Sequence, residues 1–367
     1  MKKEINNLQK IQEALKQREL KIINRLKRSS VKQDKIKKNI SHRNQTKSKI
    51  IKQENSRPNY KQAIQLSTRI KKDYLSSIIG QKTRLNLREK GSFNGSILPI
   101  TKEKFLCVYR NTEENFTSCF INRNFIVDPI SYNKMNFNNV GVTDPRLIKT
   151  SDNKVLMSYS RHFENGQEAI AANIIMDLNE STSKIKINQT LRISPAKLTD
   201  RQKNWIPFVY ENDVYFIATI CPHQIYKIDL TGSKEAELVY HETWKHTWFN
   251  TNSLRGSTNP VLLKDGNYLS TFHTTTQIKH TSFYDNGFYI FEGKPPFKPL
   301  YCGFRTFLRA EDAIEPWYRK HNQILCPFPV AMVIEDKNVI ISYGDNDSCV
   351  KILETNLDNI YKTMVKI

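Results

Sequence analysis

The segment Val140-Gly-Val-Thr-Asp-Pro-Arg146 places a carboxylate and a guanidinium close together in a short turn. A protonated carboxyl can act as a general acid, and a guanidinium fork can hold an anion or sugar hydroxyls. Asp144 precedes a proline, which fixes the backbone and stiffens the turn. An Asp-Pro pair on its own is more typical of a carboxylate at the entry of a strand, so the chemical interpretation depends on the rest of the chain.

Three further polar turns follow along the chain, and each lies beside a short, alternating apolar segment. They are Lys203-Asn-Trp-Ile-Pro-Phe208, Arg255-Gly-Ser-Thr-Asn-Pro260 and Tyr343-Gly-Asp-Asn-Asp347. A polar turn that recurs at one place in a repeating strand unit is how a β-propeller assembles a site around its axis. The pattern therefore predicts that these turns share one cavity.

The strand units that would carry these turns begin near Phe93. Short segments alternate apolar and polar residues, which is typical of half-buried strands. The turn sequences between them are Ser151-Asp-Asn153, Glu211-Asn-Asp213, Lys264-Asp-Gly266, Asp285-Asn-Gly287 and Glu335-Asp-Lys337. Four strand pairs resemble one another, and a fifth unit begins at Phe105-Leu-Cys-Val-Tyr109. We expect an all-β fold over residues 93–367, a five-bladed, antiparallel β-propeller that forms the catalytic domain.

The N-terminal arm, residues 1–58, differs in composition. Residues 1–60 contain 18 Lys and Arg against 5 Asp and Glu, so they carry +13 of the net charge of +21. Apolar residues at helical spacing predict a helix over 1–29, followed by a Lys-rich linker that ends at Pro58. A connecting helix is expected over 59–92, centred on Tyr60–Ile79.

Three interpretations of the arm stay open. Its spaced apolar residues favour self-association as a short coiled coil. Its basic face favours an anionic partner, either nucleic acid or a membrane surface. The third interpretation is a solvated, partly disordered arm, because a lone helix with an interrupted apolar seam is marginal in water.

The remaining bulk features narrow the class of protein. The six cysteines are scattered without a C-x-x-C pair, so neither a disulfide framework nor a zinc site is predicted. The N-terminus lacks the apolar segment of a signal peptide, and no run of about 18 apolar residues predicts a membrane span. A cytoplasmic protein is the expected class.

The order and the residue sequences of these polar turns resemble those of glycoside hydrolase family 130. Its members are five-bladed propeller phosphorylases and hydrolases of β-mannosides, and mannosyltransferases are related to them. The matching segments are Asp144-Pro-Arg146, Lys203-Asn-Trp-Ile-Pro207, Arg255-Gly-Ser-Thr-Asn-Pro260, Phe272-His273, Phe328-Pro-Val-Ala331 and Tyr343-Gly-Asp-Asn-Asp347. The resemblance runs from about residue 100 to about residue 360. The arm has no counterpart in it.

The resemblance implies a role for each residue. Asp144 would be the general acid, passing its proton through a sugar hydroxyl, and partial burial is expected to raise its pKa. The implied substrate-binding residues are Arg110, Asn204, Asp347 and Arg146. The implied phosphate-binding residues are Lys203, His273 and Arg255.

Several of these roles have structural alternatives. Arg146 could pair with Asp144, hold its loop or form a salt bridge within its blade, and Arg255 could contact an anion or hold the Gly-Ser-Thr turn. His273 could be a buried structural histidine. Trp205 could pack within its blade or form an apolar wall against a sugar ring, and packing is the favoured interpretation. No metal or cofactor is expected, and inorganic phosphate or a sugar phosphate would be the co-substrate. Asp345-Asn-Asp347 spells the D-x-D of metal-dependent transferases, but no βαβ pattern surrounds it.

The balance of charges selects the reaction. Inverting hydrolysis needs two carboxylates with room for a water between them, whereas phosphorolysis needs one acid and a cationic pocket. The chain offers the cations and no second carboxylate at a hydrolase-like position, which favours inverting phosphorolysis of a β-mannosidic or similar bond in a glycan, or its reverse. The alternatives are a β-mannoside hydrolase or glycosyltransferase, an inactive glycan-binding or interaction propeller, and a scaffold for a nucleic-acid-binding arm.

Overall fold

The computed structural model describes residues 80–367, with gaps at 90, 113–114, 136, 138–140, 163–167, 179–184, 188–190, 193–202, 232–234, 245–253, 279–280, 305 and 316–322. The chain divides into two units, residues 1–57 and residues 58–367. The predictions for the arm and for a helix at Tyr60–Ile79 lie outside the described residues.

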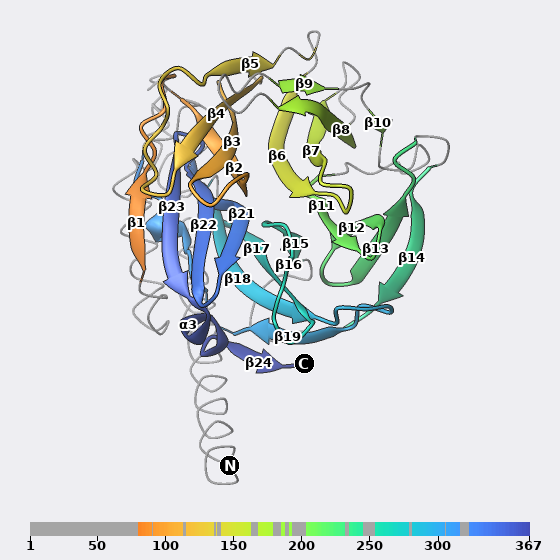
Figure 1. The fold of residues 1–367 in the computed structure, drawn as a ribbon. Helices are drawn as coiled ribbons and strands as arrows, with labels where there is room; N and C mark the ends of the chain where they lie inside the picture. The colour runs from red at the N-terminus through yellow and green to blue at the C-terminus, as the bar shows by residue number, and fades with distance from the viewer. Residues whose placement is uncertain are drawn as a thin grey trace, which may run out of the picture. The chain divides into compact units, whose positions relative to one another are not determined.

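The described residues form five sheets, which confirms the all-β prediction (Figure 1). The first sheet has the order β2-β3-β4-β5. Its strands are β2 (Phe93–Pro99), β3 (Lys104–Arg110), β4 (Phe116–Asn122) and β5 (Asn133–Met135). The second sheet has the order β10-β8-β7-β6, with β9 beside β8. Its strands are β6 (Val142–Lys149), β7 (Val155–His162), β8 (Glu168–Leu178), β9 (Ile185–Ile187) and β10 (Leu191–Arg192).

The third and fourth sheets continue the chain order. The third contains β11 (Ile206–Tyr210), β12 (Asp213–Thr219), β13 (His223–Ile228) and β14 (Glu237–Glu242). The fourth contains β15 (Arg255–Gly256), β16 (Val261–Leu262), β17 (Tyr268–Ile278), β18 (Thr281–Phe291), β19 (Pro299–Gly303), β20 (Gln323–Leu325) and β24 (Met364–Lys366). Its pairing of β18 with β20 is parallel, whereas the expected pattern was antiparallel throughout.

The last sheet joins the two ends of the described chain. Its order is β1-β23-β22-β21, formed by β1 (Gln81–Arg84), β21 (Pro327–Glu335), β22 (Asn338–Asp345) and β23 (Cys349–Asn356). The helix expected at Tyr60–Ile79 lies outside the described residues, and the strand β1, further along the connecting segment 59–92, was not expected. The strand forms there because β23 would otherwise leave its outer backbone groups unpaired.

Helices are few in this part of the chain. The structure has one turn of 3-10 helix, η1 (Ala310–Asp312), and one short helix, α3 (Leu357–Tyr361). The side chain of Asn356 caps α3 by accepting a hydrogen bond from the backbone of Asn359. Neither element qualifies as a membrane-crossing helix, within the residues described.

Each sheet packs against the next one in chain order, and the last packs against the first. The innermost strands make these contacts: β2 lies beside β6, β6 beside β11, β12 beside β15, β18 beside β21, and β21 beside β2. Figure 1 shows the same succession of sheets, from β2–β5 through to β21–β23. The strands β2, β6, β11, β15 and β21 each contact a neighbouring sheet, and these contacts bring the polar turns beside them close together.

Five hydrophobic clusters fill the spaces between neighbouring sheets. Successive side chains of one strand supply two different clusters, because side chains alternate across a strand. In β3, Leu106 and Val108 pack toward the second sheet, whereas Phe105 and Cys107 pack toward the last. A strand covered on both faces must be apolar throughout, and six of the seven residues of β3 are buried.

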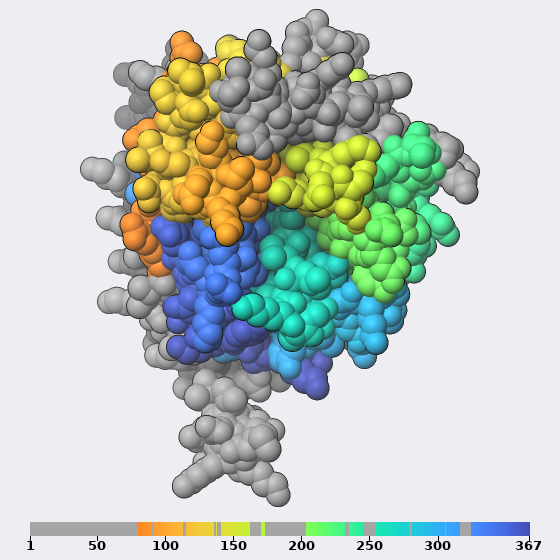
Figure 2. All heavy atoms as spheres, in the orientation of Figure 1, coloured from red at the N-terminus to blue at the C-terminus, as the bar shows by residue number. Residues whose placement is uncertain are grey.

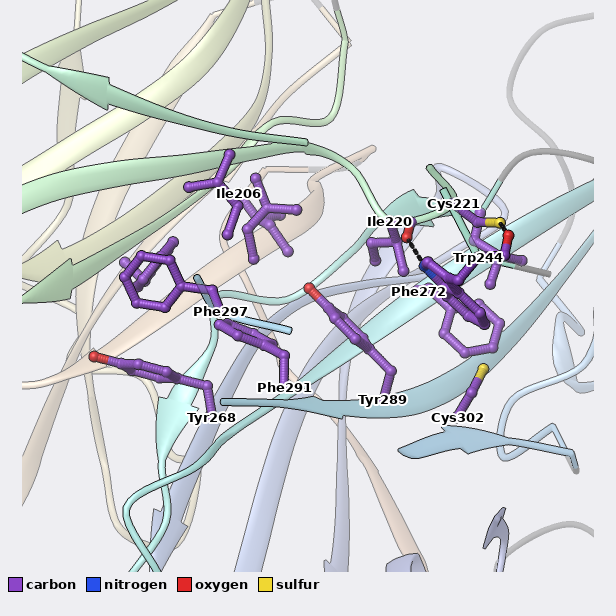
Figure 3. Close-up of a cluster of buried hydrophobic side chains, with 14 of the residues drawn as sticks. Ile206, Ile220, Cys221, Trp244, Tyr268, Phe272, Tyr289, Phe291, Phe297 and Cys302 are labelled. Atoms are coloured by element: carbon purple, nitrogen blue, oxygen red, sulfur yellow. Dashed lines mark hydrogen bonds between the residues drawn. The ribbon is translucent and has the colours of Figure 1, made fainter. Parts of the chain in front are cut away.

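The cluster between the third and fourth sheets is rich in aromatic residues (Figure 3). Tyr289 and Phe291 of β18 stack with 5.5 Å between ring centroids, and β11 contributes Ile206 from the opposite side. Trp244 closes the cluster by donating its indole N–H to the carbonyl of Ile220 at 2.6 Å. Burying each of these large side chains contributes about 1.5–3 kcal/mol, which makes such clusters the main source of stability.

The predicted turn at Asp285-Asn-Gly287 is wrong, because these residues lie inside β18 and pair with β17. Gly287 is required by packing: a Cβ there would lie 2.4 Å from the ring of Phe272. Asn286 is buried and donates to the carbonyls of Leu308 and Pro327. The polar residues here link β18 to other segments of the chain. A polar tripeptide with such a role has the same composition as a turn, which is why the sequence suggested one.

Candidate active site

Asp144 lies in a bulge of β6. The register of β6 against β7 shifts between Thr143 and Arg146, and Asp144 has a φ of 57°, in the left-handed region. A non-glycine residue held in this conformation is strained, and such strain often marks a functional position. The side chain of Asp144 is buried, with 4% of it exposed. The Asp-Pro turn therefore does more than begin a strand.

Asn94 forms a second bulge at the matching place of β2. The register shifts between Phe93 and Ser96, and Asn94 has a φ of 50°. Its Nδ2 donates to Oδ1 of Asp144 at 2.9 Å and to Oδ1 of Asp347 at 3.2 Å. Sequence analysis missed Asn94, although an Asn-Gly pair inside an apolar strand is a signal for a bulge.

Asp347 reaches the same point from the turn after β22. Asn346 and Asp347 both have left-handed backbones, with φ of 50° and 47°, and this turn directs the Asp347 side chain toward Asn94. Burial raises the pKa of Asp347 to about 6, which the charge of Arg110 opposes and the charge of Asp144 reinforces. Two carboxylates that share one amide group resist being ionised together.

Lys203 is the direct cationic partner of Asp144. Its Nζ lies 3.4 Å from Oδ2 of Asp144, and 28% of the lysine side chain is exposed. Burial alone would raise the pKa of Asp144, but the charges of Lys203, Arg110 and Arg146 and the hydrogen bond from Asn94 outweigh it and lower that pKa. The expected raised pKa of Asp144 is therefore wrong for the site without a ligand.

The side chain of His273 contacts that of Asn204, and His273 is only 2% exposed. Its Nε2 is 3.4 Å from Nδ2 of Asn204, and its Nδ1 is 2.9 Å from Oγ of Ser257. An amide nitrogen can only donate, so Nε2 is the acceptor and Nδ1 carries the proton toward Ser257. Burial, with the charges of Arg255 and Arg146, lowers the pKa of His273 to about 3. His273 therefore adds no positive charge to a phosphate pocket at neutral pH.

Arg146 holds two loops together. Its Nε donates to the carbonyl of Ser257, and its Nη1 donates to the carbonyl of Asp144, both at 3.0 Å. The side chain is 1% exposed, and its guanidinium lies 6.0 Å from the centre of the Phe328 ring. Of the interpretations considered, these contacts match the one in which Arg146 holds the Asp144 loop.

Arg110 and Arg255 complete the predicted set. Arg110 ends β3, is 6% exposed and lies over the ring of Phe93, and its charge acts on both Asp144 and Asp347. Arg255 is exposed in β15, opposite His273 of β17. Figure 2 shows atoms of the first, second, fourth and last sheets meeting at the middle of one face. The ion pair of Lys203 with Asp144, the contact of Asn204 with His273 and the effect of the Arg255 charge on His273 link all eight predicted site residues into one neighbourhood.

Asp345 and Trp205 serve the fold. Asp345 is fully buried, and its carboxylate binds Nζ of Lys351 at 2.7 Å and the backbone N–H groups of Ile314 and Glu315. Its carboxylate is occupied by these partners, so Asp345 and Asp347 do not act as a D-x-D pair. Trp205 stacks on Tyr226 at 4.6 Å within the core, as the packing interpretation predicts.

Three solved structures with a similar fold are the following. One represents the family of mannoside phosphorylases that contains hydrolases targeting β-1,2-mannosidic linkages in Candida mannan (12% identity, 74% of this chain and 85% of that chain, TM-score 0.52). The second is a β-1,2-mannobiose phosphorylase from Listeria innocua (10%, 79% and 94%, TM-score 0.50). The third is a mannose phosphorylase from Leishmania mexicana in complex with phosphate (10%, 84% and 96%, TM-score 0.51).

These identities are low, so the structures show a shared fold. No curated protein sequence matches the chain. A family model does match, over residues 61–366, and its description is β-1,4-mannooligosaccharide phosphorylase. Since the match spans most of the chain and takes in every residue of the site above, the chain belongs to glycoside hydrolase family 130.

Proposed function

We propose that the chain is a five-bladed β-propeller enzyme that cleaves a β-mannosidic or similar bond by inverting phosphorolysis, or forms it by the reverse reaction. Five sheets that pack in succession, the last against the first, support the propeller. Membership of the family supports a glycan substrate and phosphate or a sugar phosphate as co-substrate. The observation that carries the proposal is the pairing of Asp144 with an accessible cation, Lys203.

The spacing of the nearest oxygens of the two carboxylates favours phosphorolysis over inverting hydrolysis by this pair. Oδ1 of Asp144 and Oδ1 of Asp347 lie 2.9 Å and 3.2 Å from the same nitrogen, so their separation cannot exceed the sum of those distances. Inverting glycosidases hold their carboxyl groups about 6.5–9.5 Å apart to admit a water. Phosphorolysis needs no such gap, because phosphate is itself the nucleophile.

The residues take the following roles in this proposal. Asp144 is the general acid, and Asp347, Asn204 and Arg110 bind hydroxyls of the sugar that is cleaved. Lys203 and Arg255 are the cations that phosphate meets, because they are the more exposed cations of the site. Arg146 keeps the Asp144 turn in place, and neutral His273 orients Asn204.

The test is release of mannose 1-phosphate from β-mannosides, run also in the direction of synthesis. Asp144→Asn keeps the shape of the side chain and removes its proton, so we expect the rate to fall about 10²–10⁴-fold with little change in sugar binding. Lys203→Ala should raise the KM for phosphate and spare the affinity for the sugar. Asp213→Asn, at a half-exposed turn of the third sheet, is the matched control.

Three outcomes would redirect the proposal. Full activity of Asp144→Asn would remove that residue from the chemistry. Release of free mannose that does not depend on phosphate would favour a hydrolase. Binding of mannosides without turnover in either direction would favour a glycan-binding propeller.

A further inference from the structure

The carboxyl groups of Asp144 and Asp347 form a pair that one amide group bridges. Asn94 offers one N–H to each of them, and Asn94 is 3% exposed. Asp144 is buried and Asp347 is half-buried, and two negative charges at this separation repel each other unless cations compensate them. The number of protons that the pair holds therefore depends on the surrounding positive charge.

Most of that positive charge is fixed, and one part is movable. Arg146 is buried and donates to two backbone carbonyls, and Arg110 is buried over an aromatic ring. Lys203 differs from both, since 28% of its side chain is exposed and its only described ion pair is the one with Asp144 at 3.4 Å. An anion that enters the site therefore meets Lys203, whose flexible stem can turn toward it.

The titratable and charged groups around the pair come from several sheets. They are Arg110 of β3, Arg146 of β6, Lys203 before β11, Arg255 of β15, His273 of β17, Tyr284 of β18 and Cys326 before β21. Burial lowers the pKa of His273 to about 3, and burial raises the pKa values of Tyr284 and Cys326. All three are therefore neutral near pH 7, which leaves the two carboxyls as the groups able to change charge there.

We propose that binding of a doubly charged oxyanion at Lys203 makes the Asp144–Asp347 pair take up one proton. The inference rests on the proposed function, which supplies phosphate as the anion. The side chain of Lys203 turns from Asp144 to the anion. The proton comes from solvent and enters the pair, in which Asp144 has lost its cationic partner and shares the Asn94 amide with Asp347, and no covalent bond in the anion is broken.

This coupling resolves a conflict within the site. A general acid must hold a proton, yet Lys203, Arg110 and Arg146 keep the pKa of Asp144 low against the effect of burial. If the anion draws Lys203 away, burial and the charge of Asp347 then act on Asp144 with less opposition, and both favour the protonated form. Asp144 is thus loaded with its proton when the nucleophile is in place.

The experiment uses sulfate and the full chain. Sulfate is a dianion that does not itself titrate near neutral pH, so any proton taken up belongs to the protein. Titration calorimetry at about pH 7.5 in two buffers of different ionisation enthalpy gives the number of protons bound with each sulfate, and we expect about one. By linkage, the affinity for sulfate should fall up to about tenfold for each pH unit above the titration of the pair.

Matched variants locate the proton. Asp144→Asn should bind sulfate with almost no proton uptake, and Lys203→Met should weaken sulfate binding about tenfold or more. Asp213→Asn changes a carboxylate that is paired with Lys227 outside the site, and it should behave as the unaltered protein does. Sulfate binding without proton uptake, uptake that survives in Asp144→Asn, or no sulfate binding at tens of millimolar would each overturn the proposal.

The outcome separates this inference from the proposed function. Proton uptake linked to sulfate, in a protein that does not turn over any β-mannoside, would leave the coupling intact and refute the enzyme. Phosphate-dependent release of mannose 1-phosphate by a protein that binds sulfate without proton uptake would support the enzyme and refute the coupling.

Discussion

Gly344 lies directly against Asn94, and a Cβ atom added to Gly344 would come within 1.9 Å of Oδ1 of Asn94. Gly344 belongs to β22 of the last sheet and Asn94 to β2 of the first, so this contact closes the succession of sheets at the site. The glycine of the Tyr-Gly-Asp segment is required because the bridging amide occupies the space that a side chain would fill.

Gly344→Ala should therefore damage the site more than the fold. The new methyl group would push the Asn94 amide away and weaken its hydrogen bonds to both carboxylates, and a displacement of about 1 Å can cost about 10²-fold in rate. We expect kcat to fall about 10–10²-fold, measured in the mannose 1-phosphate assay, with a small change in melting temperature.

Gly266→Ala is the control for this substitution. Gly266 lies in a turn, has a φ of 84° and has open space around the position of an added Cβ atom. Alanine there is strained without touching the site, so we expect a loss of about 1 kcal/mol of stability with kcat unchanged. Unchanged kcat in Gly344→Ala as well would show that the position of Asn94 is unimportant for turnover.

The convergence of the polar turns could be predicted because it follows from repetition. Asp144 lies in the first strand of its unit and Lys203 just before the first strand of the next, and these two strands, β6 and β11, are neighbours in the structure. Alternating hydrophobicity fixes which residues are buried, and a residue's place in a repeat fixes which edge it reaches.

Features that depend on non-local pairing could not be predicted. Strand β1 exists because β23, about 270 residues later, offers it an edge, and nothing in Gln81-Lys-Thr-Arg84 requires a strand. The polar tripeptide at 285–287 reads as a turn until its partners on other segments are known. The neutral state of His273 follows from burial, which a motif does not reveal.

His223 should make the protein less stable in acid. It is fully buried among Tyr240, Tyr289 and Phe291, and burial lowers its pKa to about 3 from the ordinary 6.5, although the backbone of Phe297 opposes the shift. The unfolded chain binds a proton below pH 6.5 and the folded chain resists it. This contribution to stability is therefore complete above pH 6.5 and is lost as the pH falls toward 3.

His223→Phe isolates that effect, because other groups also titrate. Asp347, whose pKa is raised, has the opposite sign and destabilises the fold as the pH rises toward 6. We expect the free energy of unfolding, measured in urea at pH 7 and pH 5, to fall about 2 kcal/mol less in the variant than in the parent. His241→Phe alters an exposed ring on the neighbouring strand and is the control for exchanging a histidine for a phenylalanine. Parallel curves for His223→Phe and the parent would contradict the assignment.

Lys351 should be essential for the stability of the last sheet. It is 7% exposed and its Nζ binds the fully buried carboxylate of Asp345 at 2.7 Å. Burial would lower the pKa of Lys351, but the hydrogen bond and the charge of Asp345 raise it. Removing one partner leaves an unpaired buried charge, so Lys351→Met should cost about 3–5 kcal/mol.

A double variant provides the comparison for Lys351. Asp345→Asn together with Lys351→Met removes both charges, so we expect urea unfolding to show a smaller loss than Lys351→Met alone. Lys337→Met breaks an exposed pair with Asp358, and such pairs contribute about 0–1 kcal/mol. Equal, small losses for Lys351→Met and Lys337→Met would show that the buried pair is not needed.

Two truncations should differ sharply in stability, since β1 begins after the predicted arm. Deleting residues 1–58 leaves β1 in place, and we expect the melting temperature to stay within a few degrees, because the arm has no strand pattern. Deleting residues 1–86 also removes β1 and Leu85, which is 2% exposed, together with the ion pair of Lys82 with Asp312. The edge of β23 would then be open, and the loss of the buried leucine alone is worth about 2–5 kcal/mol. Thermal unfolding of both proteins decides the matter: similar melting temperatures would mean that β1 contributes little, and a large loss on removing 1–58 alone would mean that the arm packs on the folded body.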